Sequence, residues 1–330
     1  MPILQEIFLI PQSGLSEDLI YDNWQDLQKQ NYLALCPRLQ SLTSHFALIV
    51  PTRTMADLQH LSFSMRTPDS DTPLWLALAM TPKLKALDVY FPSYWSWKLR
   101  PAPPEGVRSL LALRRIGAYG YPSSMDFDWI NYLRTPQLDT LAVALEHRET
   151  FIVLFRILRR QVRHLIISTV ENPFGGYYYY RDVDFLQLLE TVEVLELRDH
   201  RPHMLSRTDQ SFFKSMLRTC TDDPTSFSAR ITRLVIRDSC LHLPACKSLA
   251  KFVKFRDEAA AKNGGTPFAF TLINSTIKKR DGEHPPEFLQ HFQKYISDSL
   301  IDSESVSGDS EQYEEEGDDD DKDDIGEEDM

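Results

Sequence analysis

The sequence predicts an α/β protein in which one short motif, repeated along the chain, builds a curved solenoid with parallel strands on its concave face and helices outside. Three observations lead to this prediction. A Leu-x-x-Leu-x-Leu motif, clearest at Leu84, Leu87 and Val89, occurs in seven copies. Apolar stretches with helical character lie between copies, and the spacing of the copies fits one strand and one helix per repeat.

The motif is a strand signal. Its last two apolar positions alternate along a short strand and point to one side, while the first lies where the chain enters the strand. One such strand cannot bury its apolar face alone, so neighbouring repeats must stack. The seven copies are Leu58/Leu61/Phe63, Leu84/Leu87/Val89, Leu113/Ile116/Ala118, Leu138/Leu141/Val143, Val162/Leu165/Ile167, Val192/Leu195/Leu197 and Ile231/Leu234/Ile236, with Leu39/Leu42 as a weaker eighth.

The spacing of the copies predicts one irregular repeat. The central apolar residues, at positions 61, 87, 116, 141, 165, 195 and 234, are 26, 29, 25, 24, 30 and 39 residues apart. The first five intervals suit repeats of twenty to thirty residues. The last requires an insertion, which we place at residues 201–223. Beyond it, residues 244–256 have the pattern of an amphipathic helix, and residues 268–273 that of a last strand.

Over roughly residues 35–273 the chain resembles a leucine-rich-repeat protein. Regular leucine-rich repeats follow each strand with an Asn that bonds the backbone of the neighbouring turn, and this sequence has no such ladder, so its solenoid is irregular. The Pro-Arg/Lys-Leu-x-x-Leu entries that begin at Pro37 and Pro82 are similar to the repeat half of fungal F-box proteins. The alternative is another kind of α/β domain whose strands share the motif by accident.

Residues 1–34 have two interpretations. Ser16, with Glu17 and Asp18 in the following turn, predicts the start of a helix, so the segment can be a helical cap on the first repeat. The segment is also similar to a degenerate F-box remnant. That resemblance implies that a Skp-family adaptor of a cullin-type ubiquitin ligase would be held by five residues: Pro2, Ile7, Phe8, Leu19 and Trp24.

The chain divides further by charge. From Asp298 onward the chain carries 17 Asp and Glu residues and a single basic residue, Lys322, whereas the rest of the chain carries 35 basic and 31 acidic residues. We expect a solenoid over residues 35–275, a capping helix over 276–298 and a disordered acidic tail over 299–330, because such a tail cannot bury enough apolar surface to order itself. The body's slight basic excess gives no nucleic-acid footprint.

Two surfaces are candidate partner sites. Aromatic residues follow three strands, where loops are usually polar, and parallel strand ends lie along one rim; exposed aromatics are typical of recognition surfaces, although they can also pack over the solenoid edge. These rim residues are Tyr94, Trp95, Trp97, Tyr119, Tyr121, Tyr177, Tyr178, Tyr179 and Tyr180.

On the concave face, residues between the buried positions point outward and become richer in Arg in later repeats. An acidic partner segment is expected to dock there, at Arg115, His164, Arg198, Arg233 and Arg237. The alternative is a solvated face of mixed charge.

The sequence carries none of the motifs of common enzymes. It has no Gly-x-Gly-x-x-Gly, phosphate-binding loop, His-Glu-x-x-His or Gly-x-Ser-x-Gly, and His200 and His203 lack nearby residues to complete a metal site. We therefore expect no catalysis, cofactor or metal. Four scattered cysteines indicate reduced thiols, and no apolar run reaches 18 residues, so we expect a cytoplasmic or nuclear protein with no membrane partner.

These features predict a non-catalytic protein-protein interaction solenoid. The resemblance to fungal F-box proteins implies substrate recognition for a cullin-type ubiquitin ligase. The alternative is an acidic-tailed nuclear leucine-rich-repeat protein that binds basic partners such as histones. A GTPase activator of the Ran type shares the repeats and the tail. Both of these classes have more regular repeats, which argues against them.

Overall fold

The computed structural model describes the chain over residues 4–9, 33, 36–44, 54–64, 72–91, 108–120, 124–145, 148–168, 184–198, 208–263 and 268–278. Residues 299–330, for which the sequence predicts a disordered acidic tail, lie outside these ranges. No helix within them is long and apolar enough to cross a membrane.

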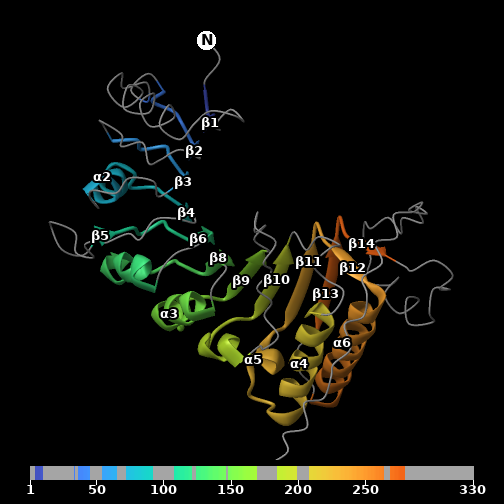
Figure 1. The fold of residues 1–330 in the computed structure, drawn as a ribbon. Helices are drawn as coiled ribbons and strands as arrows, with labels where there is room; N and C mark the ends of the chain where they lie inside the picture. The colour runs from blue at the N-terminus through green and yellow to red at the C-terminus, as the bar shows by residue number, and fades with distance from the viewer. Residues whose placement is uncertain are drawn as a thin grey trace, which may run out of the picture.

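The centre of the fold is a sheet of ten parallel strands whose spatial order follows the chain, as predicted for an α/β solenoid. In Figure 1 the strands lie along the inner side of an arc and the helices along its outer side. The strands are β1 (Glu6–Leu9), β2 (Ser41–Ser44), β3 (His60–Ser64), β4 (Ala86–Phe91), β6 (Arg115–Gly120), β8 (Thr140–Leu145), β9 (His164–Ser168), β10 (Val194–Arg198), β11 (Arg233–Arg237) and β13 (Ala269–Ile273).

The strands pair without any shift in register. The central apolar residue of each motif lies opposite the central residue of the next, so that Leu61 pairs with Leu87 and Leu165 with Leu195. These residues are at most 2% exposed, and burying each contributes about 2 kcal/mol. The predicted strand at residues 268–273 completes the row, with Phe270 opposite Leu234. All eight motif copies found in the sequence are therefore confirmed as strands of one sheet.

A recurring turn fixes how the chain enters each strand. In three repeats a Pro occupies the second position of that turn, and the residue two positions later donates its N–H back across it, as from Leu84 to the Thr81 carbonyl at 3.2 Å. Proline suits this position because its ring presets φ. The next two N–H groups then bond one carbonyl of the preceding repeat; those of Lys85 and Ala86, for example, both bond Gln59. This shared carbonyl keeps the repeats in register.

The outer layer of the described chain contains five α-helices and two 3-10 helices, which bury the other side of the sheet. Phe91 of β4 packs edge to face on Phe127 at 5.5 Å between ring centroids, and Phe151 packs similarly on Phe155 at 5.6 Å. The helices are α2 (Thr72–Met80), η2 (Ser124–Tyr132), α3 (Arg148–Leu158), η3 (Asp184–Leu188), α4 (Thr208–Asp222), α5 (Phe227–Arg230) and α6 (Leu243–Asn263). Helix α4 accounts for the insertion predicted at residues 201–223.

The prediction for residues 1–34 is wrong over residues 6–9, which form strand β1 rather than part of a helical cap. The reason is visible in the sequence, because Leu4, Ile7 and Leu9 repeat the motif once more. Ile7 lies opposite Leu42 and packs against the core, whereas Phe8 is 60% exposed. Apart from Leu33, the rest of residues 10–34 lies outside the described chain.

The predicted capping helix at residues 276–298 is also wrong at its start. Residues Thr276–Lys278 form strand β14, which pairs in parallel with β12 (Cys240–His242). Asn274 and Asp238, both with positive φ, bend the chain at equivalent points after β13 and β11, so each strand continues into a second short one. Residues 279–298 lie outside the described chain. A further small pair joins β5 (Arg108–Ser109) to β7 (Leu133–Arg134).

Candidate functional site on the concave face

The outward side chains of the sheet form rows because the strands are in register. One row, midway along the strands, runs through Asp88, Gly117, Ala142, Ile166 and Glu196. Asp88 and Glu196 are only 7% and 5% exposed at their side chains, although they belong to the outward face. A buried carboxylate is stable only with charged or hydrogen-bonded partners, so these two residues organise the face around them.

Asp88 lies at the centre of the first group, which we call the Asp88 cluster. His60 Nε2 lies 2.9 Å from Asp88 Oδ2, and Arg115 Nη2 lies 3.2 Å from Oδ1. Arg115 also donates to the Tyr119 hydroxyl at 2.7 Å, and that hydroxyl donates to Asp88 Oδ1 at 3.4 Å. Ser41 Oγ completes the cluster at 3.2 Å from His60 Nδ1. One aspartate thus joins side chains from strands β2, β3, β4 and β6.

The tyrosines of this cluster are held by packing as well. Tyr90 and Tyr119 stack at 4.8 Å between centroids. Burial and the nearby Asp88 raise the pKa of both phenols, so they stay protonated at neutral pH. Gly117, directly opposite Asp88, leaves the space that the cluster fills, since a Cβ there would lie 2.0 Å from Asp88 Oδ1 and 2.6 Å from the Tyr119 ring.

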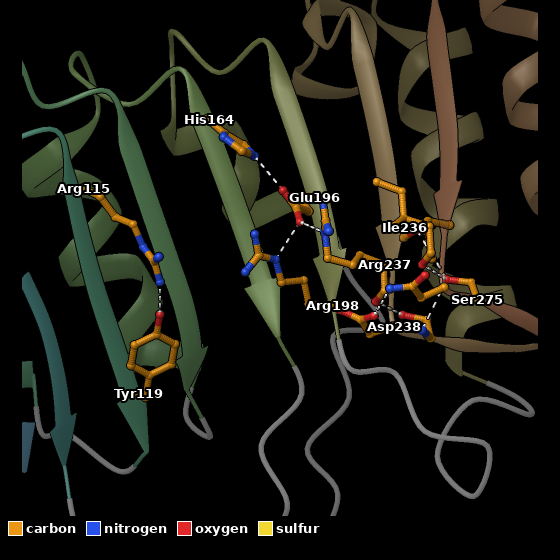
Figure 2. A network of polar contacts seen from close by, with 12 residues as sticks. Arg115, Tyr119, His164, Glu196, Arg198, Ile236, Arg237, Asp238 and Ser275 are labelled. Carbon is orange, nitrogen blue, oxygen red and sulfur yellow. Dashed lines mark hydrogen bonds and ion pairs between the residues drawn. The ribbon is translucent and has the colours of Figure 1, made fainter. Parts of the chain in front are cut away.

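The second group, the Glu196 cluster, has a different arrangement of partners (Figure 2). The Nε atoms of Arg198 and Arg237 both donate to Glu196 Oε1, at 2.6 and 3.0 Å. His164 Nε2 lies 3.1 Å from the other oxygen, Oε2. The three partners come from β9, β10 and β11, so one glutamate joins three consecutive strands.

The electrostatic state of Glu196 follows from these contacts. Burial alone would raise the pKa of its carboxyl, but the hydrogen bonds from His164, Arg198 and Arg237 outweigh burial and lower the pKa to about 2. Glu196 is therefore ionised at any physiological pH. Charge-assisted hydrogen bonds of this kind are the strong ones, so they hold the two guanidinium groups in fixed positions.

The Glu196 cluster leaves hydrogen-bond donors for a ligand. Its bonds use only the Nε atoms of the two arginines, and the side chains of Arg198 and Arg237 stay 32% and 36% exposed. Arg233, on β11, is exposed on the same face. On the outward face of β10 and β11, as the structure describes it, three guanidinium groups stand against the one carboxylate of Glu196, so this part of the face is positive. A guanidinium group presents paired N–H donors that match the oxygens of a carboxylate or phosphate, so the chemistry of the cluster suits an acidic group.

Ser41, His60 and Asp88 have the composition of a nucleophilic triad, but the part of the chain that the structure describes does not show its remaining parts. A triad needs a pair of free N–H groups to stabilise an oxyanion beside the nucleophile. The backbone of Ser41 to Ser44 pairs with β1 on one side and β3 on the other. Asp88 is also shared with Arg115. We interpret the contacts among Ser41, His60 and Asp88 as a means of ordering the concave face.

Two serines that the sequence interpretation passed over join the last repeats. Ser239 and Ser275 are 4% and 3% exposed and follow the positive-φ residues Asp238 and Asn274. The Ser239 N–H donates to Ser275 Oγ at 3.3 Å, and Ser275 Oγ lies 3.4 Å from the Ile236 carbonyl (Figure 2). They bond the neighbouring turn as a ladder Asn would. The signal was the sequence Ile/Leu-x-Asp/Asn-Ser, which the ends of β11 and β13 share.

The concave-face residues predicted from the sequence all lie on strands of that face, but in two separate groups. Arg115 belongs to the Asp88 cluster, and His164, Arg198 and Arg237 to the Glu196 cluster. Arg233 stands beside the second group without a place in its hydrogen bonds. The sequence did not reveal the two carboxylates as their partners. Aligning the repeats by their central residues would have placed Asp88 between His60 and Arg115.

Most predicted rim residues lie outside the described chain, namely Tyr94, Trp95, Trp97, Tyr121, Tyr177, Tyr178, Tyr179 and Tyr180. Tyr119 is described, and its predicted place in a connecting loop is wrong, because it lies within β6 on the concave face. Its backbone lies opposite Tyr90 of β4, and its hydroxyl accepts from Arg115. Of the predicted adaptor residues, Ile7 and Phe8 lie on β1, while Pro2, Leu19 and Trp24 are outside the described chain.

No family model, curated protein or solved structure matches this chain.

Proposed function

We propose that the chain is an irregular leucine-rich-repeat solenoid that binds a protein partner through the β9–β11 end of its concave face. The motif, the entry turns and the Ser239–Ser275 pair support the leucine-rich-repeat assignment. The Glu196 cluster carries the binding proposal, because a buried glutamate fixes two partly exposed guanidinium groups through their Nε atoms and does not bond their terminal nitrogens. Preorganised donors lose little side-chain entropy when a ligand binds. The partner segment is acidic.

As the resemblance to fungal F-box proteins implies, we further propose that the bound partner is a substrate for a cullin-type ubiquitin ligase. The contact with the Skp-family adaptor would use the edge formed by β1. Leu4 and Phe8 are 52% and 60% exposed there, whereas Ile7 packs against the core and is not free to bind. Exposed apolar side chains at one edge can anchor a partner.

Affinity capture with the full chain tests the adaptor proposal. Phe8→Ser with Leu4→Ser should abolish capture of the Skp-family adaptor from a fungal extract. Leu111→Ser, at a residue 57% exposed in a turn elsewhere, is the matched control and should capture as much adaptor as the unchanged chain. Equal capture by all three chains would remove the β1 edge from the adaptor contact, and no capture by any would remove the ligase role.

The acidic tail favours a second candidate function, the binding of basic partners such as histones. From Asp298 onward the chain carries 17 acidic residues against one Lys. Replacing the Asp and Glu of residues 298–329 with Asn and Gln should then abolish histone capture at 150 mM salt without changing adaptor capture. Histone capture that survives this change would exclude the tail as its site.

A further inference from the structure

The positive end of the concave face and the acidic end of the chain are complementary in charge. Arg198 and Arg237, on the adjacent strands β10 and β11, both pair with the carboxylate of Glu196, and Arg233 of β11 is exposed on the same face. The residues from Asp298 onward carry a net charge of −16, with 17 acidic residues and Lys322. No other part of the sequence has a comparable run of one sign.

The chain is long enough to bring these two regions together. Strand β13 pairs with β11, so that Ile273 lies opposite Arg237. Paired strands are about 5 Å apart, and the five residues from Ile273 to Lys278 span at most about 17 Å, so Lys278 lies within roughly 20 Å of Arg237. Residues 279–297 follow and can span up to about 65 Å when extended. The chain between Lys278 and Asp298 is therefore long enough for the tail to reach the Glu196 cluster.

Tethering favours this contact further. A segment on a short connection experiences an effective concentration on the order of millimolar at a nearby site. Weak ion pairs that would not hold a free peptide can then be populated. Because exposed ion pairs are screened beyond about 10 Å at 0.1 M ionic strength, the contact should depend strongly on salt.

We propose that the acidic segment from Asp298 to the end of the chain docks on Arg198, Arg233 and Arg237 and occupies the β9–β11 end of the concave face. The carboxylates pair with the guanidinium nitrogens that Glu196 leaves unused. An acidic partner segment must displace the tail before it binds. That consequence for partner binding rests on the proposed function, whereas the intramolecular contact does not.

Photo-crosslinking of the full chain tests the contact. A benzophenone amino acid replaces Tyr313 within the tail, and crosslinked peptides are mapped by mass spectrometry at 50 mM and 500 mM NaCl. We expect crosslinks to peptides of β9, β10 and β11 at low salt and at least a five-fold loss at high salt. Mixing ¹⁴N- and ¹⁵N-labelled chains separates contacts within one chain from contacts between two.

The structure offers a matched control with the same residue types. The variant Glu196→Gln/Arg198→Gln/Arg237→Gln removes the charges without leaving a buried carboxylate unpaired. The control Glu190→Gln/Arg159→Gln/Arg160→Gln makes the same changes where Arg159 and Arg160 pair with the half-exposed Glu190 after α3. Crosslinks to β9–β11 should fall at least five-fold in the first variant and remain in the second.

A milder variant covers the case in which the triple variant does not fold, as circular dichroism would show. Arg233→Gln cannot disturb Glu196 and should lower the crosslink yield two- to three-fold. Yields that stay unchanged in both Arg233→Gln and the folded triple variant would overturn the proposal. Crosslinks that form only between chains, or only to peptides away from β9–β11, would overturn it as well. The crosslink yield does not depend on partner capture, so a failure to capture a partner would not count against the intramolecular contact.

Discussion

The Asp88 and Glu196 clusters solve the same physical problem with opposite electrostatic results. Each buries a carboxylate on the concave face and bonds it to a His on the preceding strand, at the same register offset. Asp88 then takes one Arg and a Tyr hydroxyl, so the cluster is balanced and closed by stacked rings. Glu196 takes two Arg, so its cluster carries a net positive charge. The comparison indicates that the first cluster orders the face and that the second can bind.

The residues opposite the two carboxylates explain part of this difference. Gly117 lies opposite Asp88, and Val235 lies opposite Glu196. Where the neighbour has no side chain, Asp88 and Tyr119 occupy its space. Beside Glu196 the two neighbouring positions carry Val235 and Ile166 instead. The neighbour at this register position thus differs between the two clusters.

The largest effect is expected at Glu196. Glu196→Gln should lower the free energy of unfolding by about 3 kcal/mol at pH 7, since a shift of the carboxyl pKa from 4.5 to about 2 corresponds to that amount. Because the folded pKa is the lower one, this contribution is complete above about pH 4.5 and is lost as the pH falls toward 2. Urea unfolding of both chains between pH 7 and pH 3 measures it. A stability difference that does not shrink below pH 4.5 would contradict the ionised pairing.

Gly117→Ala should cost about 2 kcal/mol, because the new Cβ overlaps the Asp88 carboxylate and must displace it. The same register position in the other cluster supplies the control. Val235→Ala removes two methyl groups and adds no clash, and it should cost about 1 kcal/mol. Chemical denaturation of both variants makes the comparison. If Gly117→Ala were neutral, the close fit of the Asp88 cluster would be wrong.

Tyr119→Phe is expected to cost about 1 kcal/mol, since it removes the hydroxyl that accepts from Arg115 but keeps the ring stack on Tyr90. The variant also addresses the predicted rim role of Tyr119. Loss of partner capture with unchanged stability would make the hydroxyl a binding group instead of a structural one. Differential scanning fluorimetry together with capture of an acidic partner peptide separates the two roles.

The smallest effect is expected where arginines pair with an exposed glutamate. Arg160→Ala should change the free energy of unfolding by less than about 0.5 kcal/mol, because Arg160 is 71% exposed and Glu190 49%. Urea unfolding measures the change. This small value is the reference for the comparison, because the same residue types are expected to contribute far more to the free energy of unfolding around the buried Glu196. A cost near 2 kcal/mol would mean that exposure does not separate the two kinds of pair.

The sequence predicted the sheet well because its signal is local and repeated. Each motif contains the alternation that makes a strand, and seven copies in series imply the parallel stack. The exception at β1 was also within reach, since Leu4, Ile7 and Leu9 fit the motif. The mainly apolar opening at residues 3–10 is consistent with either a helix or a strand when read alone. Pairing with β2 decides between them.

The candidate site was predicted only in part because its chemistry depends on contacts between repeats. Alternation shows that Arg198 and Arg237 point outward, yet it does not show that one glutamate oxygen accepts from both. The predicted role of Arg115 illustrates the limit. Read alone it is a free cation for an acidic partner, whereas beside Asp88 and Tyr119 most of its charge is already satisfied.

Both proposals for the concave face rest on an ionised Glu196 that holds two guanidinium groups, and its titration tests this most directly. Carboxyl ¹³C shifts of glutamate-labelled protein, with Glu196→Gln to assign the signal, should show Glu196 still deprotonated at pH 3.5, consistent with a pKa of about 2. A midpoint near 4.5 would mean that Arg198 and Arg237 do not pair with it, and the fixed donors of the concave face would not exist.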